Sequence, residues 1–216
     1  MQQYIIVFEV MAGLSSWIAW PAIHRIKYLR VFPFLLTLIV GVELSQVLSV
    51  PGFIENNAII YNLLEPIQWT LYAWSFYIAF QSVVYRKFLW FSGVLYYLVF
   101  AISFPFYLQS QHYNVIVYAL GSVILIVAAL MKFYEMLKSP VDFNFLRLPY
   151  FYIVFAFLLF TLGTMPYFTM GNWLYYELNQ RQTALVFRDV MSFMNLLLYA
   201  TYTTCFLWIR VKKVSF

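Results

Sequence analysis

The sequence predicts an all-α protein: a bundle of seven membrane-spanning helices with its N-terminus outside and its C-terminus in the cytoplasm. Of the 216 residues, 64% are hydrophobic and only 10% are charged, whereas soluble domains are about a quarter charged. Aromatic residues make up 23% of the chain, which is typical of many helix ends at the headgroup level of a bilayer. The apolar residues also form runs of about 20, the length that a helix needs to cross the hydrocarbon core. Composition and run length together indicate a membrane protein.

Seven such runs can be placed, and turn residues or charges separate each from the next. The first four cover about 4–22, 31–50, 58–81 and 88–108, and they end at HRIKYLR (24–30), PGFIENN (51–57), YRK (85–87) and QSQHYN (109–114). The last three cover about 114–134, 149–170 and 187–209, divided by KSPVDFNFLRLP (138–149) and GNWLYYELNQRQ (171–182). No connecting segment is long enough to separate two domains, so residues 1–216 are predicted to form a single transmembrane domain.

The orientation follows from the lysines and arginines, which favour cytoplasmic loops. One side of the predicted bundle collects 11 of the 13 basic residues: Arg25, Lys27, Arg30, Arg86, Lys87, Lys132, Lys138, Arg147, Arg210, Lys212 and Lys213. The other side has only Arg181 and Arg188. The bias alternates at every loop, which predicts an odd number of spans and a cytoplasmic C-terminus. A bacterial inner membrane is the expected location.

Three glutamates lie inside the predicted spans, where ionisable residues are costly and face the interior of a bundle. Glu9, Glu43 and Glu65 are about five to seven residues from the outer ends of the first three helices. At 1.5 Å per residue, all three lie roughly 7–11 Å below the outer surface of the hydrocarbon. Three carboxylates at one depth on consecutive helices predict a shared site.

Polar neighbours on the same helices extend this predicted site. On the third span, Asn62, Glu65 and Tyr72 follow helical spacing, with Gln68 beside them. On the seventh, a stripe with the same kind of spacing runs from Arg188 through Ser192 and Asn195 to Tyr199 and Tyr202, with Asp189 at its top. Arg188 is the one cation near the glutamate layer and is therefore the expected counter-ion.

Two interpretations of these polar residues remain open. In the first they only hold helices together, by contacts worth about 0.6 kcal/mol each in membranes. In the second they line a cavity that opens outward and binds a cation, a proton or a small polar ligand. Three buried carboxylates cost more than helix association requires, which favours the second.

Several other classes of function lack the residues that they need. The single cysteine, Cys205, excludes an internal disulfide and a cysteine-based metal site, and no metal or cofactor is expected. Neither His24 nor His112 lies inside a predicted span, so no Ser/His/Asp arrangement can be placed and no enzymatic activity is expected. The seventh span lacks a lysine for a retinal Schiff base. Because the basic residues set orientation, the net charge of +5 does not indicate a nucleic-acid partner.

The order of hydrophobic segments resembles a family of small seven-helix membrane proteins, common in Bacteroidetes, for which no activity is established. The matching segments are FPFLLTLIVGVELS (32–45), NNAIIYNLLEPIQWTLYAW (56–74), KFYEMLKSP (132–140), LPYFYIVFAFLLFTLGTMPYF (148–168) and NLLLYATYTTCFLW (195–208). The resemblance implies the same topology and recurring glutamates at Glu43 and Glu65. Pro66 departs from the family pattern, in which an aromatic or apolar residue follows the second glutamate.

Two functions are compatible with these features. The protein senses or binds a small ligand or cation from outside and couples to a protein partner at its basic cytoplasmic face, or it is a small transporter or channel that uses the same glutamates. A transporter needs a polar path through the inner half, where only hydroxyls such as Thr161, Thr164 and Thr203 are available. That asymmetry favours a closed pocket.

Overall fold

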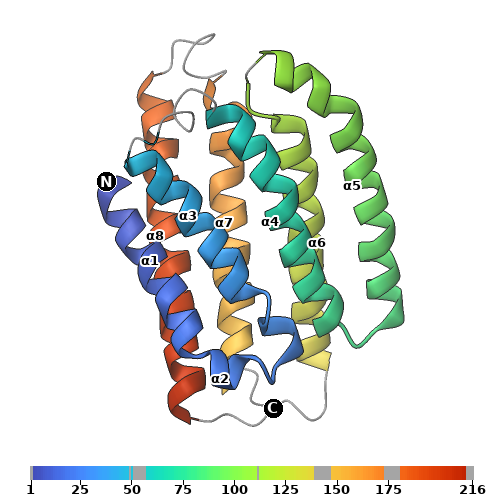
Figure 1. Cartoon of the computed structure of the whole chain (residues 1–216). Coiled ribbons are helices and arrows are strands. Elements are labelled where there is room, and N and C mark those ends of the chain that lie inside the picture. The colour runs from blue at the N-terminus through green and yellow to red at the C-terminus, as the bar shows by residue number, and fades with distance from the viewer. Residues whose placement is uncertain are drawn as a thin grey trace. The chain divides into compact units, whose positions relative to one another are not determined.

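The computed structural model of the chain describes residues 2–48, 50, 57–110, 112–138, 147–172 and 181–212, and all the regular structure among them is helical (Figure 1). The elements are α1 (Gln2–Ile18), α2 (Trp20–Ile23), the 3₁₀ turn η1 (Lys27–Leu29), α3 (Phe32–Val47), α4 (Asn57–Ala79), α5 (Val83–Ser110), α6 (Val115–Lys138), α7 (Pro149–Asn172) and α8 (Arg181–Lys212). The all-α prediction is confirmed. The predicted connecting segments 51–56, 139–146 and 173–180, and Lys213, lie outside the described residues.

Within the described ranges, five helices are long and apolar enough to cross a membrane. They cover Lys27–Val47, Val83–Leu108, Val115–Lys138, Pro149–Met170 and Leu185–Val211. Helices of this length and composition indicate an integral, multi-pass membrane protein. They correspond to five of the seven predicted spans.

The other two predicted spans are helical but differ from the expected form. The predicted span 4–22 is divided, because α1 ends at Ile18 and α2 begins at Trp20 with Pro21 in its first turn. Proline has no N–H to continue the hydrogen bonds of a preceding helix. The third span coincides with α4, whose 23 residues are sufficient in length, but Asn62, Glu65 and Gln68 make it less apolar than the five helices above.

The chain divides into two compact units. The central unit comprises residues 26–135, and the terminal unit comprises residues 1–25 and 136–216. In the terminal unit, α8 packs against α7, α1 and α2. Its largest fully buried side chains include Tyr202 and Phe206 of α8 and Ile153 of α7.

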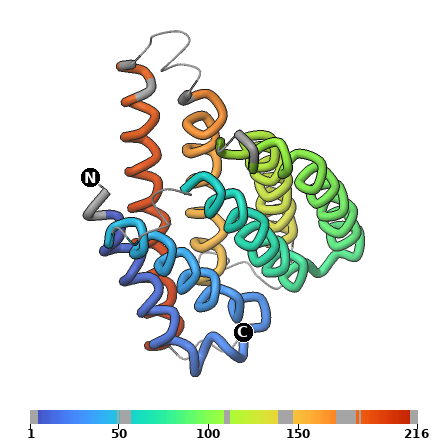
Figure 2. The backbone as a smooth tube through the Cα atoms, turned by 45° about the horizontal axis from the view of Figure 1, so that its top comes forward, coloured from blue at the N-terminus to red at the C-terminus, as the bar shows by residue number. Residues whose placement is uncertain are grey.

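In the central unit, α4 lies between α3 on one side and α5 and α6 on the other (Figures 1 and 2). Trp69 of α4 is the centre of this packing. Its ring stacks on Tyr96 of α5 with 4.2 Å between centroids, and its indole N–H donates to the Gly121 carbonyl of α6 at 3.2 Å. One tryptophan thus joins three helices.

Gly121 permits this arrangement because it has no side chain. A Cβ at this position would lie 2.8 Å from Trp69 Cδ1 and 2.8 Å from Tyr96 Cε2. Gly121→Ala is therefore expected to separate the stacked rings and lower the free energy of unfolding by about 1–3 kcal/mol. Thermal unfolding in detergent, followed by tryptophan fluorescence, measures the change.

Gly41→Ala is the matched control, because a Cβ at Gly41 of α3 would have nothing within 4 Å. It is expected to leave stability unchanged or to raise it by up to about 1 kcal/mol through helix propensity. Equal unfolding midpoints for the two variants would contradict the role assigned to Gly121.

Candidate functional site

Asn62 joins the first half of α4 to the chain segment that enters α6. Its amide Nδ2 donates to the His112 carbonyl at 2.8 Å, and its Oδ1 accepts from the Asn114 backbone N–H at 2.7 Å. The side chain is 2% exposed. Asn62 therefore holds the 112–114 segment in position beside α4.

Asn114 connects the same segment to α5 and α6. Its Oδ1 accepts from the Val117 N–H at 3.2 Å, which caps the first turn of α6. Its Nδ2 donates to Ser103 Oγ of α5 at 2.8 Å. The two asparagines thus fix the backbone on both sides of Tyr113.

The hydroxyl of Tyr113, which these contacts position, donates a hydrogen bond to Glu65 Oε2. The distance of 3.4 Å is long for a hydrogen bond between two oxygens, so the contact is weak. Burial, and after it the charge of Glu65, raises the pKa of Tyr113 well above its ordinary value. The phenol is therefore the protonated donor.

Tyr96 of α5 is a second phenol, and its ring stacks on Trp69, one helical turn after Glu65 on α4. It is fully buried, and its hydroxyl has no hydrogen-bond partner among the described residues. Buried polar atoms in proteins are nearly always paired, and an orphan hydroxyl often indicates a bound water, ion or ligand. We call Asn62, Glu65, Tyr96 and Tyr113 the Glu65 site.

Glu43 of α3 contacts α4 one helical turn before Glu65. It accepts the Tyr61 hydroxyl at 2.5 Å, and Gln46 donates to Asn57 at 3.2 Å beside it. The structure thus places Glu43 and Glu65 on packed helices, each bound to a different tyrosine. Within the central unit, no described lysine or arginine pairs with either carboxylate.

The other predicted residues of α4 have different surroundings. Tyr72 is buried and packs edge-on against Phe32 of α3, with 6.1 Å between centroids. Gln68 is half-buried. The ring of Tyr72 thus contributes to the packing of α4 against α3.

The terminal unit contains the remaining predicted site residues. Glu9 of α1 is 5% exposed. Arg188 and Asp189 of α8 form an ion pair at 3.7 Å with more than half of each side chain exposed, and Asn195 donates to the Met191 carbonyl of its own helix. It stays a prediction that Arg188 pairs with the glutamates. It also stays a prediction that Glu9 shares a site with Glu43 and Glu65.

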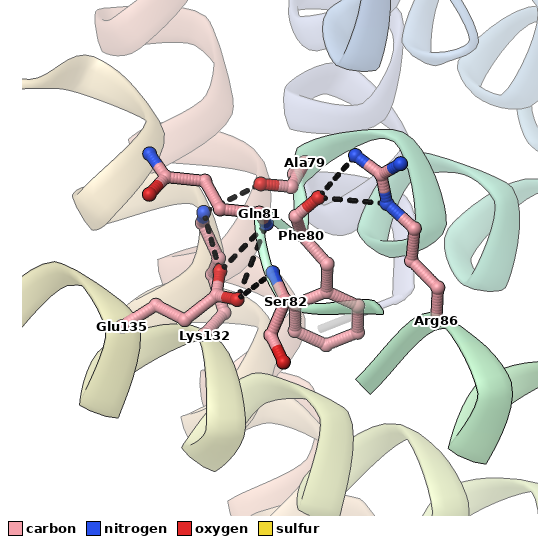
Figure 3. Close-up of polar contacts among 7 residues, drawn as sticks. All are labelled: Ala79, Phe80, Gln81, Ser82, Arg86, Lys132 and Glu135. Atoms are coloured by element: carbon pink, nitrogen blue, oxygen red, sulfur yellow. Dashed lines mark hydrogen bonds and ion pairs between the residues drawn. The ribbon is translucent and has the colours of Figure 1, made fainter. Parts of the chain in front are cut away.

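Two basic residues that were expected only to set the orientation, Arg86 and Lys132, lie with Glu135 at the other end of α4 (Figure 3). Lys132 of α6 is 7% exposed; it donates to the Ala79 carbonyl at 2.6 Å and pairs with Glu135 at 3.1 Å. Arg86 of α5 donates through Nε and Nη2 to the Phe80 carbonyl at 2.9 and 2.6 Å. Both cations thus bind carbonyls where α4 ends, at the negative end of its dipole.

Glu135 completes this charged turn cluster, which we define as Arg86, Lys132 and Glu135. Its carboxylate accepts the backbone N–H groups of Gln81 and Ser82 just before α5 begins. The turn was expected at 85–87, but α5 already begins at Val83. Sequence reasoning missed Glu135, although its i, i+3 spacing from Lys132 on a helix indicates a pair.

Among the described residues, no group of three or more His, Cys, Asp or Glu side chains gathers as a metal ion would require. Comparison of the chain with protein-family models, curated proteins and solved structures found no match. The chemistry of the site therefore has to be argued from its geometry.

Proposed function

We propose that the protein binds a proton, a cation or a small cationic ligand at the Glu65 site and signals its presence to a partner protein. In this proposal all seven helical segments cross a bacterial inner membrane, with the N-terminus outside. The site then lies near the outer face, and the partner docks at the basic cytoplasmic face. The alternation of lysine and arginine between loops supports this orientation.

The observation that carries the proposal is the incomplete set of partners around Glu65. A carboxylate has about four acceptor positions, and among the described residues of the central unit Glu65 receives one phenol at 3.4 Å and no cation. In a low-dielectric environment such a group takes up a proton or binds a positive charge. The orphan hydroxyl of Tyr96, whose ring stacks on Trp69 one helical turn further along α4, offers a second polar group to a ligand.

The hydrogen bonds made by threonine hydroxyls in α7 and α8 favour ligand binding over transport. Thr161, Thr164 and Thr203 donate to carbonyls four residues earlier in their own helices, at 2.8–2.9 Å. Their protons are therefore engaged within the helix. The threonines are three of the five side chains from which a polar path through the inner half would have to be built, the others being Tyr199 and Tyr202.

Glu65→Gln tests the proposal. Thermal unfolding is measured in detergent across pH and with a panel of Na⁺, K⁺, a primary amine and a quaternary amine. A ligand at 100 times its Kd stabilises the folded state by about 2.7 kcal/mol, so at least one condition is expected to raise the wild-type midpoint and to leave Glu65→Gln unchanged. An equal shift in both proteins would contradict binding at Glu65.

Tyr96→Phe separates ligand binding from packing. Because the hydroxyl is an orphan, its removal is expected not to lower stability without ligand, but it should reduce the ligand-induced shift. Asp189→Asn, which removes an exposed and already paired carboxylate, is the control. Ion or amine flux into proteoliposomes that Glu65→Gln abolishes would identify a transporter instead.

A further inference from the structure

A groove of about 680 Å³ runs between α4 and α5 of the central unit. Its lining includes the small residues Ala73 on α4 and Gly93 on α5. It also includes the exposed side chains of Trp74, Trp90 and Val94. The lining on α4 extends from Trp69 to Tyr77, eight positions further along the helix. At 1.5 Å per residue the groove is about 12 Å long.

The groove lies on the helix with the fewest buried residues among the five. In the apolar stretch of α5, 11% of the residues are buried, compared with 50% in α6. Trp90, Phe91 and Leu98 are each more than half exposed. On a helix that crosses a membrane, such side chains face lipid, so acyl chains are the natural occupants of the groove.

One end of the groove carries positive charge. Tyr77 lines the groove at the end nearest the α4–α5 turn, and the Arg86 guanidinium lies over its ring at 5.9 Å. Arg86 uses Nε and Nη2 on the Phe80 carbonyl, while Nη1 has no partner among the described residues. Lys87 beside it is exposed. Both residues lie one turn before Trp90, so two cations border the mouth of an apolar groove.

We propose that this groove holds an acyl chain of an anionic phospholipid whose headgroup phosphate binds Arg86 and Lys87. Basic sites between transmembrane helices at the cytoplasmic surface bind anionic headgroups in this way. A second copy of the chain is a poorer occupant. Two copies related by a two-fold axis along the membrane normal would place the same cations at the same depth, where they repel.

The test is native mass spectrometry of the full chain in mild detergent with equimolar phosphatidylglycerol and phosphatidylcholine. The wild type is expected to retain phosphatidylglycerol preferentially. Lys87→Gln should reduce this preference about fivefold, the effect of one basic residue at a membrane surface. Lys27→Gln, an exposed lysine elsewhere in the central unit, should leave the preference unchanged. Arg86 is not varied because it also binds the Phe80 carbonyl.

Val94→Trp tests the acyl-chain contact. It fills the groove without altering charge and is expected to lower retention of both lipids, whereas Val123→Trp, at a comparably exposed position of α6, should not. Equal retention of the two lipids by the wild type would overturn the proposal, as would equal losses in Lys87→Gln and Lys27→Gln. A lipid-free dimer that Val94→Trp dissociates would assign the groove to a second copy.

Discussion

Lys132→Met is expected to lower the free energy of unfolding by about 3–5 kcal/mol, the cost of removing one partner of a buried ion pair. The ammonium of Lys132 binds the Ala79 carbonyl and Glu135 from a position that is 7% exposed. Methionine keeps the length of the chain but leaves the Glu135 carboxylate without its cation. Thermal unfolding in detergent measures the loss.

Two further variants separate the charge pair from a general effect of losing a lysine. Lys27→Met removes an exposed lysine of the same unit and is expected to change stability by less than about 0.5 kcal/mol. Lys132→Met combined with Glu135→Gln should be less destabilising than the sum of the two single variants, because the double variant buries no unpaired charge. If Lys132→Met and Lys27→Met have the same unfolding midpoint, the charged turn cluster does not stabilise the fold.

Asn62→Leu is expected to lower the free energy of unfolding by about 1–3 kcal/mol. Leucine fills a similar volume but leaves the N–H of the buried Asn114 without its acceptor and the carbonyl of the exposed His112 without its donor. One buried unsatisfied group costs about 1–3 kcal/mol. Asn114 is 3% exposed, so water does not readily replace the lost contact. The Asn114 amide should also exchange its hydrogen faster, which hydrogen-exchange mass spectrometry detects.

Gln68→Leu is the control for Asn62→Leu. It replaces a half-buried amide on the same helix that has no hydrogen bond to another described residue, so stability should change by less than about 0.5 kcal/mol. The Glu65 site should also respond differently to the two variants. Because Asn62 holds the segment that carries Tyr113, Asn62→Leu is expected to weaken any ligand-induced shift, and Gln68→Leu is not. Similar exchange rates at Asn114 in both variants would contradict the bridge assigned to Asn62.

Local sequence patterns predicted the helices well because each depends on its own residues. Six of the seven apolar runs each correspond to one helix, and α7 begins at Pro149 as expected. The pattern was less informative where one residue changes the path of the chain. Pro21 divides the first run. The turn before α5 lies at 80–82, where Glu135 of the distant α6 and Arg86 of α5 bind its backbone.

The partners of the site residues could not be predicted, because they depend on packing between helices. Helical spacing placed Asn62 beside Glu65, but their contacts with His112, Tyr113 and Asn114 join residues 48–52 positions apart. No local pattern contains that pairing. Tyr96 was also missed, since a tyrosine in an apolar run does not reveal that its hydroxyl will be left without a partner.

The charged turn cluster also bears on how the protein is made. Glu135 caps Ser82 from 53 residues further along the chain, and at a synthesis rate of about 5–20 residues per second it emerges roughly 3–10 s after the turn. Until then, the Gln81 and Ser82 amides between α4 and α5 lack this acceptor. The arrival of α6 is therefore the step of biogenesis that caps this turn.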